Sequence, residues 1–150
     1  MKKRCFLMGS RIIADNIPEL LKEQVERLIE QEGVTEFLVG QRGSFDMVAA
    51  DTVRKAKERH PWVRLILLKA YRRDGEHQLP GDFDESLYPE GQDKASYRFA
   101  IVRANIYAAE HCDLMLFYPA YPWGNTQKMI DRMLRRPKES RAEMIIMQDR

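Results

Sequence analysis

Long apolar runs are missing from this sequence of 150 residues. Its longest apolar runs are only the length of a strand, whereas about 20 apolar residues are needed to span a bilayer. The basic start, residues 1–4, leads into an apolar run that is too short for a signal peptide. We therefore expect a cytoplasmic protein without a membrane anchor, in which residues 1–150 form a single domain.

Cysteine and net charge are also scarce. The two cysteines, Cys5 and Cys112, lie in apolar stretches without a C-x-x-C partner, so we expect free thiols in a reducing compartment. The 25 basic and 23 acidic residues leave a net charge of +2, which does not favour a dedicated nucleic-acid binder. His77 lies among acidic residues, but their spacing matches no metal-ligand pattern. We expect no metal and no cofactor.

Strand and helix patterns alternate along the chain. Short, continuously apolar runs are found at residues 5–8, 36–40, 63–68, 113–118 and 144–147, as is typical of strands covered on both faces. Amphipathic helices are predicted between these runs. This order predicts an α/β fold, namely a Rossmann-like, open, mostly parallel five-stranded sheet with helices on both faces.

Three features of this pattern carry further expectations. Residues 71–95 have no clear period, and an irregular loop of this length is often a lid or a binding loop. The third helix is expected from about Ser96 to His111, with Phe99, Val102, Ile106 and Tyr107 buried. The first helix is expected to be capped by the side chain of Asn16.

The candidate site follows from the sheet. Ligands of open parallel sheets bind outside the carboxyl ends of the strands, where the strand order reverses. This rule selects the loops at residues 9–11, 40–46, 71 onward and 118–126.

Two of these loops are glycine turns that precede helices. They are Gly40-x-x-Gly43-Ser44 and Gly124-Asn125-Thr126. Glycine lets a ligand approach the backbone, and the free amides of a helix start attract anions, although a plain capped turn explains each sequence equally well. Asp46 could bind a ribose hydroxyl or could only favour the helix dipole. Neither turn is a Walker A or G-x-G-x-x-G motif.

Basic and aromatic residues add candidates in the same loops and on the third helix. Arg11 and Arg103 could bind phosphate, or could be ordinary solvated arginines. Asn105 lies two positions after Arg103 and therefore does not share its helix face. Tyr71 and Trp123 could stack on a base. No Ser-His-Asp or Cys-His arrangement is evident.

Four segments resemble the SLOG (SMF/DprA–LOG) superfamily, in particular its YpsA-like branch. Residues 5–11 are similar to its first strand and turn, "CxxTGHR", and residues 34–50 to its "veFyvGgalGfDxlaA" segment. Residues 103–114 resemble "RNxxmvdxsdxliav", and residues 124–126 correspond to a "GGT" turn. The resemblance implies a Rossmann-like fold, a nucleotide or nucleotide-derived ligand and a homodimer.

By position, the resemblance also implies a set of ligand-binding residues. These are Gly9, Ser10, Arg11, Gly40, Gly43, Ser44, Asp46, Arg103, Asn105, Gly124 and Thr126. Enzymes of the LOG group cleave nucleoside monophosphates at the N-glycosidic bond and carry PGGxGTxxE, but the position of the glutamate is Met129 here. We therefore expect nucleotide binding or sensing, with N-glycosidic hydrolysis and a ligand-free protein-interaction module as alternatives.

Overall fold

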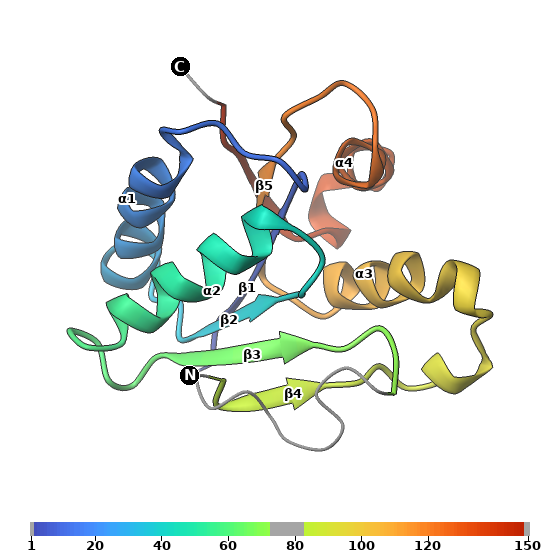
Figure 1. The fold of residues 1–150 in the computed structure, drawn as a ribbon, viewed down its shortest axis with the longest axis horizontal. Helices are drawn as coiled ribbons and strands as arrows, with labels where there is room; N and C mark the ends of the chain where they lie inside the picture. Colours follow the sequence, from blue (N-terminus) through green and yellow to red (C-terminus); the bar gives the residue numbers. More distant parts are fainter. Residues whose placement is uncertain (1, 73–82, 149–150) are drawn as a thin grey trace.

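The computed structural model describes residues 2–72 and 83–148 (Figure 1). Its six strands form one sheet in the order β4-β3-β2-β1-β5-β6, and every neighbouring pair is parallel. The strands are β1 (Arg4–Gly9), β2 (Glu36–Val39), β3 (Arg64–Leu68), β4 (Glu85–Leu87), β5 (Leu114–Tyr118) and β6 (Glu143–Ile146). The α-helices are α1 (Ile17–Glu30), α2 (Ser44–Ala56), α3 (Ala100–Glu110) and α4 (Asn125–Leu134). The predicted open, parallel α/β sheet is confirmed.

The prediction of five strands is wrong by one, because β4 lies inside the segment expected to be an irregular loop. This strand has only three residues, none of them buried, and it pairs with β3 at the edge of the sheet. So short and polar a strand has no recognisable period in the sequence. Residues 73–82 of the expected loop lie outside the described residues.

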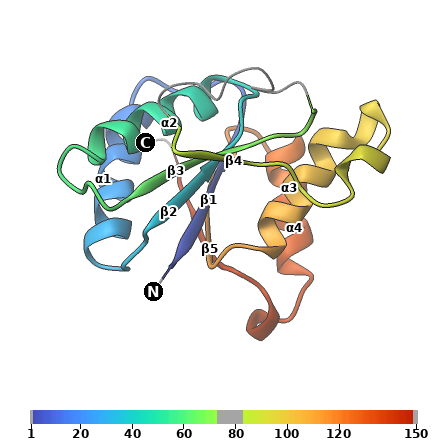
Figure 2. The same cartoon turned by 90° about the horizontal axis from the view of Figure 1, so that it is seen from below.

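The helices cover both faces of the sheet, with α1 and α2 on one side and α3 and α4 on the other (Figure 2). The side chains of β1 alternate between the two layers. Cys5 and Leu7 belong to the core under α1 and α2, whereas Phe6 and Met8 belong to the core under α3 and α4. This double burial explains why the strand sequences are continuously apolar.

The start of the first helix differs from the prediction. The helix buries Ile17, Leu21, Val25, Leu28 and Ile29, and Gly33 follows it with a positive φ of 73°. The expected side-chain cap is wrong, since Asn16 makes no capping hydrogen bond. The helix begins instead with a proline in its first turn, which has no amide hydrogen to satisfy.

The buried face of α3 also differs from the prediction. A short 3₁₀ turn, Tyr97–Phe99, precedes α3. The four buried side chains of α3 are all alanines. Phe99 is 59% exposed and Val102 41% exposed, so the expectation that they are buried is wrong. The helix contributes to the core through small side chains, whereas periodicity alone favoured the larger apolar residues.

The reversal of strand order lies between β1 and β5. The chain adds β2, β3 and β4 on one side of β1, and then β5 and β6 on the other. The carboxyl ends of β1 and β5 meet there, because Gly9 is in register with Tyr118. Within the described part of the chain, no helix is long and apolar enough to cross a membrane.

Candidate ligand-binding site

A cavity of about 270 Å³ opens at this reversal point. Ten residues expected from the sequence to bind a ligand line it: Gly9, Ser10, Arg11, Gly40, Asp46, Asn105, Trp123, Gly124, Asn125 and Thr126. Four others, Gly43, Ser44, Tyr71 and Arg103, are not among its lining residues. The cavity therefore gathers residues from β1, the end of β3, the loops that follow β1, β2 and β5, and the helices α2, α3 and α4.

The cavity also includes residues outside the expected set. They are Phe6, Leu7, Met8, Arg42, Leu68, Ala70, Ile101, Ala104 and Tyr121. Met8 and Leu68 are strand ends, so the rule for open sheets could have found them. Ile101 and Ala104 carry no local signal, because only the docking of α3 brings them to the cavity.

The start of α4 is the best placed anion site of the cavity. Gly124 takes a positive φ of 97°, and no side chain caps the helix. The first main-chain bond of the helix runs from the amide of Lys128 to the Gly124 carbonyl at 3.0 Å. The amides of the first turn, which precede this bond, are directed out of the helix end, where its dipole favours negative charge.

Several polar side chains around this helix start make no hydrogen bond or ion pair with the part of the chain that the structure describes. Among the described residues, the side chains of Arg11, Asn105, Asn125 and Thr126 form neither a hydrogen bond nor an ion pair. Thr126 is buried, and Asn105 is half-buried. Arg11 and Asn125 are exposed, and none of the four side chains has a polar atom that is both fully buried and without a partner. Their polar atoms are therefore accessible to a polar ligand in the cavity.

The glycine turn before α2 has a different role. The amide of Ser44 donates to the carbonyl oxygen of Arg11 at 2.8 Å, so the first amide of α2 is already used. A Cβ on Gly43 would lie 2.7 Å from the Arg11 Cα. This glycine therefore allows two loops to pack against each other, and of the turn's glycine and serine residues only Gly40 lines the cavity, together with Arg42.

The first loop is held by structural contacts as well. A Cβ on Gly9 would lie 2.3 Å from the ring of Phe45, so glycine is required there by packing. The hydroxyl of Ser10 donates to the carbonyl of Tyr118 at 3.3 Å and accepts from the amide of Ala120 at 2.9 Å. Ser10 therefore joins the ends of β1 and β5, although it also lines the cavity.

Asp46 is the one acidic side chain among the lining residues. Its Oδ2 accepts a hydrogen bond of 2.8 Å from the amide of Arg42. Burial raises the pKa of Asp46 from 3.8 to about 6, against the opposing effects of this bond and of the Arg42 and Arg11 charges. A carboxyl that titrates near neutral pH in a cavity is typical of a functional site.

Aromatic rings border the cavity on the side of the β5–α4 loop. Tyr121 and Trp123 are stacked, with ring centroids 5.2 Å apart and planes inclined by 13°. Trp123 is 67% exposed, so part of its ring is accessible. Tyr71 instead stacks on Tyr97, at a centroid distance of 4.7 Å, and Arg42 lies over its ring.

The guanidinium of Arg103 forms its hydrogen bonds outside the cavity. Its guanidinium donates to the carbonyl of Glu90 at 3.2 Å and to Oε1 of Gln92 at 3.3 Å. Gln92 is buried and in turn donates to the carbonyls of Ala70 and Ala100. These contacts fasten the segment after β4 to α3, a structural role that the sequence did not indicate.

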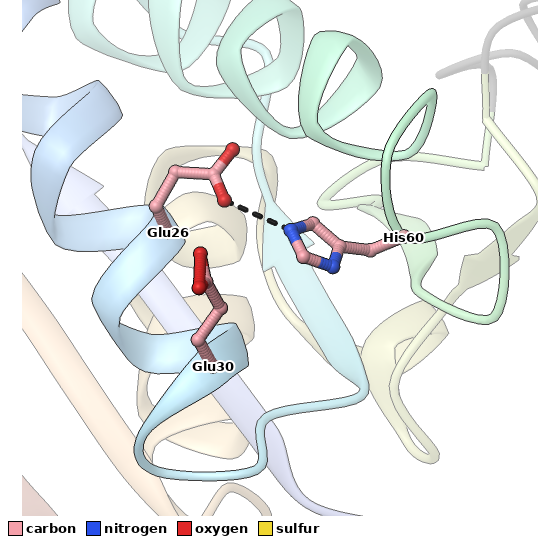
Figure 3. Close-up of side chains that lie close together, drawn as sticks. All are labelled: Glu26, Glu30 and His60. Carbon is pink, nitrogen blue, oxygen red and sulfur yellow. Dashed lines mark hydrogen bonds and ion pairs between the residues drawn. The ribbon is translucent and has the colours of Figure 1, made fainter.

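A separate cluster joins α1 to the end of α2 (Figure 3). Potential ligand atoms of Glu26, Glu30 and His60 lie within 4.8 Å of one another. Nε2 of His60 is 2.9 Å from the Glu26 carboxylate, which also accepts a hydrogen bond from Arg59. Burial alone would raise the pKa of Glu26, but the bonds from Arg59 and His60 lower it below its ordinary value.

This cluster is better explained as an ion-pair network than as a metal site. Arg59 already supplies the positive charge that a metal ion would bring to Glu26. Metal-bound histidines normally donate their second ring N–H to another group, but Nδ1 of His60 is buried without a hydrogen-bond partner among the described residues.

Comparison of the chain with models of known protein families and with curated proteins finds no match. The function is therefore inferred from the geometry of the cavity.

Proposed function

We propose that the cavity binds a nucleotide or a nucleotide-derived ligand, with a phosphate at the start of α4. The observation that carries this proposal is the uncapped first turn of α4, surrounded by the unpartnered side chains of Arg11, Asn125 and Thr126. Helix starts of this kind bind phosphate through main-chain amides and the helix dipole, and arginine adds bidentate contacts.

The other walls of the cavity fit the remaining parts of a nucleotide. The exposed ring of Trp123, held by stacking on Tyr121, offers a surface for a base. The carboxylate of Asp46 offers an acceptor for ribose hydroxyls. The resemblance to the YpsA-like branch of the SLOG superfamily supports the same ligand class.

The experiment that tests the proposal is titration of the protein with a panel of nucleotides, monitored by thermal stability and calorimetry. A ligand at 100 times its Kd should stabilise the wild type by about 2.7 kcal/mol. Asn125→Asp should weaken binding at least about tenfold, because it adds a negative charge where the phosphate would lie. The fold should remain stable, since an aspartate at a helix start is favourable.

Asn16→Asp is the matched control, because it makes the same change at the start of α1, outside the cavity lining. It should leave binding unchanged. If no nucleotide binds the wild type, or if both variants lose affinity equally, the proposal is wrong and the protein-interaction module becomes the favoured alternative.

A second candidate function, hydrolysis of the N-glycosidic bond of a nucleotide, is favoured by one observation. The Asp46 carboxyl lies in the cavity lining and titrates near neutral pH, as acid–base residues of glycosidic hydrolysis often do. Water would attack C1′ of the ribose, and the base would leave with the bonding electrons and take up a proton. Met129, at the position of the LOG glutamate, is buried in the core and supplies no carboxylate.

Product analysis separates the two functions. An enzyme would release free base and ribose 5-phosphate from a bound nucleoside monophosphate, and Asp46→Asn would abolish the release without abolishing binding. Recovery of the intact nucleotide after prolonged incubation would favour binding or sensing.

A further inference from the structure

A second cavity, of about 410 Å³, lies between α3 and α4. These two helices cover the same face of the sheet (Figure 2). The second cavity shares Met8, Asn105 and Asn125 with the first, so the two are adjacent. A ligand bound in the first cavity could therefore extend past these three residues into the second.

One wall of this second cavity is cationic. Lys128, Arg132 and Arg135 follow one another at intervals of three and four residues, so they share one side of α4. Within residues 2–72 and 83–148, none of the three side chains forms an ion pair or a hydrogen bond. Asp131 also lines the cavity and accepts a hydrogen bond of 3.0 Å from Gln127. The cavity therefore carries a positive charge that the described residues do not balance.

The remaining surface of the second cavity is apolar. Phe99 and Val102 line it and are exposed, and Ile106 and Met129 lie beside them. A surface that combines exposed apolar side chains with unpaired cations fits a ligand that has both a flat apolar part and an anionic part. A nucleotide base and its phosphate are such a pair.

The spacing along α4 agrees with two successive phosphates. The helix rises about 1.5 Å per residue, so Arg132 is attached roughly 10 Å beyond Asn125. Long helical side chains lean back toward the N-terminus, which brings the cationic groups closer to the first phosphate site. A second phosphate that is one nucleoside away from the first would lie beside the cationic groups of Lys128 and Arg132.

We propose that the cavity between α3 and α4 is a second subsite, and that the ligand of this protein is a dinucleotide. Its first phosphate would lie at the start of α4, its second beside Lys128 and Arg132, and its second base over Phe99 and Val102. This inference rests on the proposed nucleotide function and specifies its ligand class.

The test compares three probes by calorimetry: adenosine 5′-monophosphate, diadenosine 5′,5′-diphosphate and 5′-phosphorylated adenylyl-(3′→5′)-adenosine. The phosphorylated adenylyl-adenosine, whose two phosphates are one nucleoside apart, should bind the wild type about tenfold more tightly than the monophosphate, since charge-assisted phosphate contacts are among the strong ones. Diadenosine diphosphate, whose phosphates are directly linked and cannot reach both sites, should lack this gain, and an equal gain for both dinucleotides would overturn the assignment of two phosphate sites.

The double variant Arg132→Gln/Arg135→Gln should bring the dinucleotide affinity to within about threefold of the monophosphate affinity, which itself should stay unchanged. Lys22→Gln, which removes an exposed positive charge on α1, is the control for loss of charge away from the cavity and should preserve the preference. Circular dichroism would establish that each variant is folded.

The outcomes separate the two proposals. Equal affinities for the three probes in the wild type, or an unchanged preference in the double variant, would overturn the dinucleotide subsite while nucleotide binding stands. Failure of every probe to bind the wild type would overturn both.

Discussion

Asp46→Asn should stabilise the folded protein at neutral pH, because the folded state holds this carboxyl in an environment that disfavours its charge. The pKa of Asp46 rises from 3.8 to about 6 on folding, chiefly through burial. A group whose acid form is favoured in the folded state costs stability as pH rises from the unfolded to the folded pKa. At about 1.4 kcal/mol per unit, the wild type should lose about 2 kcal/mol between pH 4 and pH 7 from this group.

The assay is urea unfolding of the wild type and the variant at pH 4, 5, 6 and 7. The advantage of Asp46→Asn should grow with pH and level off above pH 6, reduced slightly by the lost interaction of the charge with the start of α2. Asp51→Asn, a change at an exposed ion pair on the same helix, should show no such growth. A constant difference across this range, or an advantage at pH 4 that disappears at pH 7, would refute the reasoning.

Three further predictions concern the framework. Gly9→Ala should cost about 1–3 kcal/mol or prevent folding, measured by urea unfolding, because its Cβ would lie 2.3 Å from the Phe45 ring. Glu26→Gln should cost about 1–2 kcal/mol at pH 7. The pKa of Glu26 is lowered in the folded state, so its contribution to stability is fully present above the pKa of the unfolded state. The contribution is lost as the pH falls through the pKa of the folded state. A Glu26→Gln variant that loses as much stability at pH 3 as at pH 7 would contradict this. Burial raises the pKa of Cys112 to about 12 and also raises that of Cys5, so a thiol reagent should label both only in denaturant.

Much of the fold was predictable because parallel sheets leave a strong local signal. Strands covered on both faces are continuously apolar, and the helices between them repeat at helical spacing. The strand β4 was not predictable, because three residues at an edge, two of them polar, depend on pairing with β3 rather than on their own pattern. The packing of α3 through alanines was missed for a related reason, since alanine is too common in helices to mark a buried face.

The candidate site was predictable where it depends on topology. The rule that ligands bind at the carboxyl ends of the strands found the loops that contain Ser10, Asp46 and Trp123. It could not separate the two glycine turns, because only the structure reveals that the Ser44 amide is bonded to the Arg11 carbonyl. The partners of Arg103 come from the segment after β4, 11 and 13 residues earlier in the chain, and no local pattern indicates this pairing.

Tryptophan fluorescence offers the most direct test of nucleotide binding in the cavity. The chain has two tryptophans, and Trp62 lies against His60, away from the cavity lining. In the Trp62→Phe variant, Trp123 is therefore the only tryptophan, and a base that stacks on it should quench its emission. We predict saturable quenching by a nucleotide, reduced at least about tenfold in affinity when Asn125→Asp is added. Emission that stays constant across the nucleotide panel, without any ligand-dependent gain in stability, would contradict the proposed function.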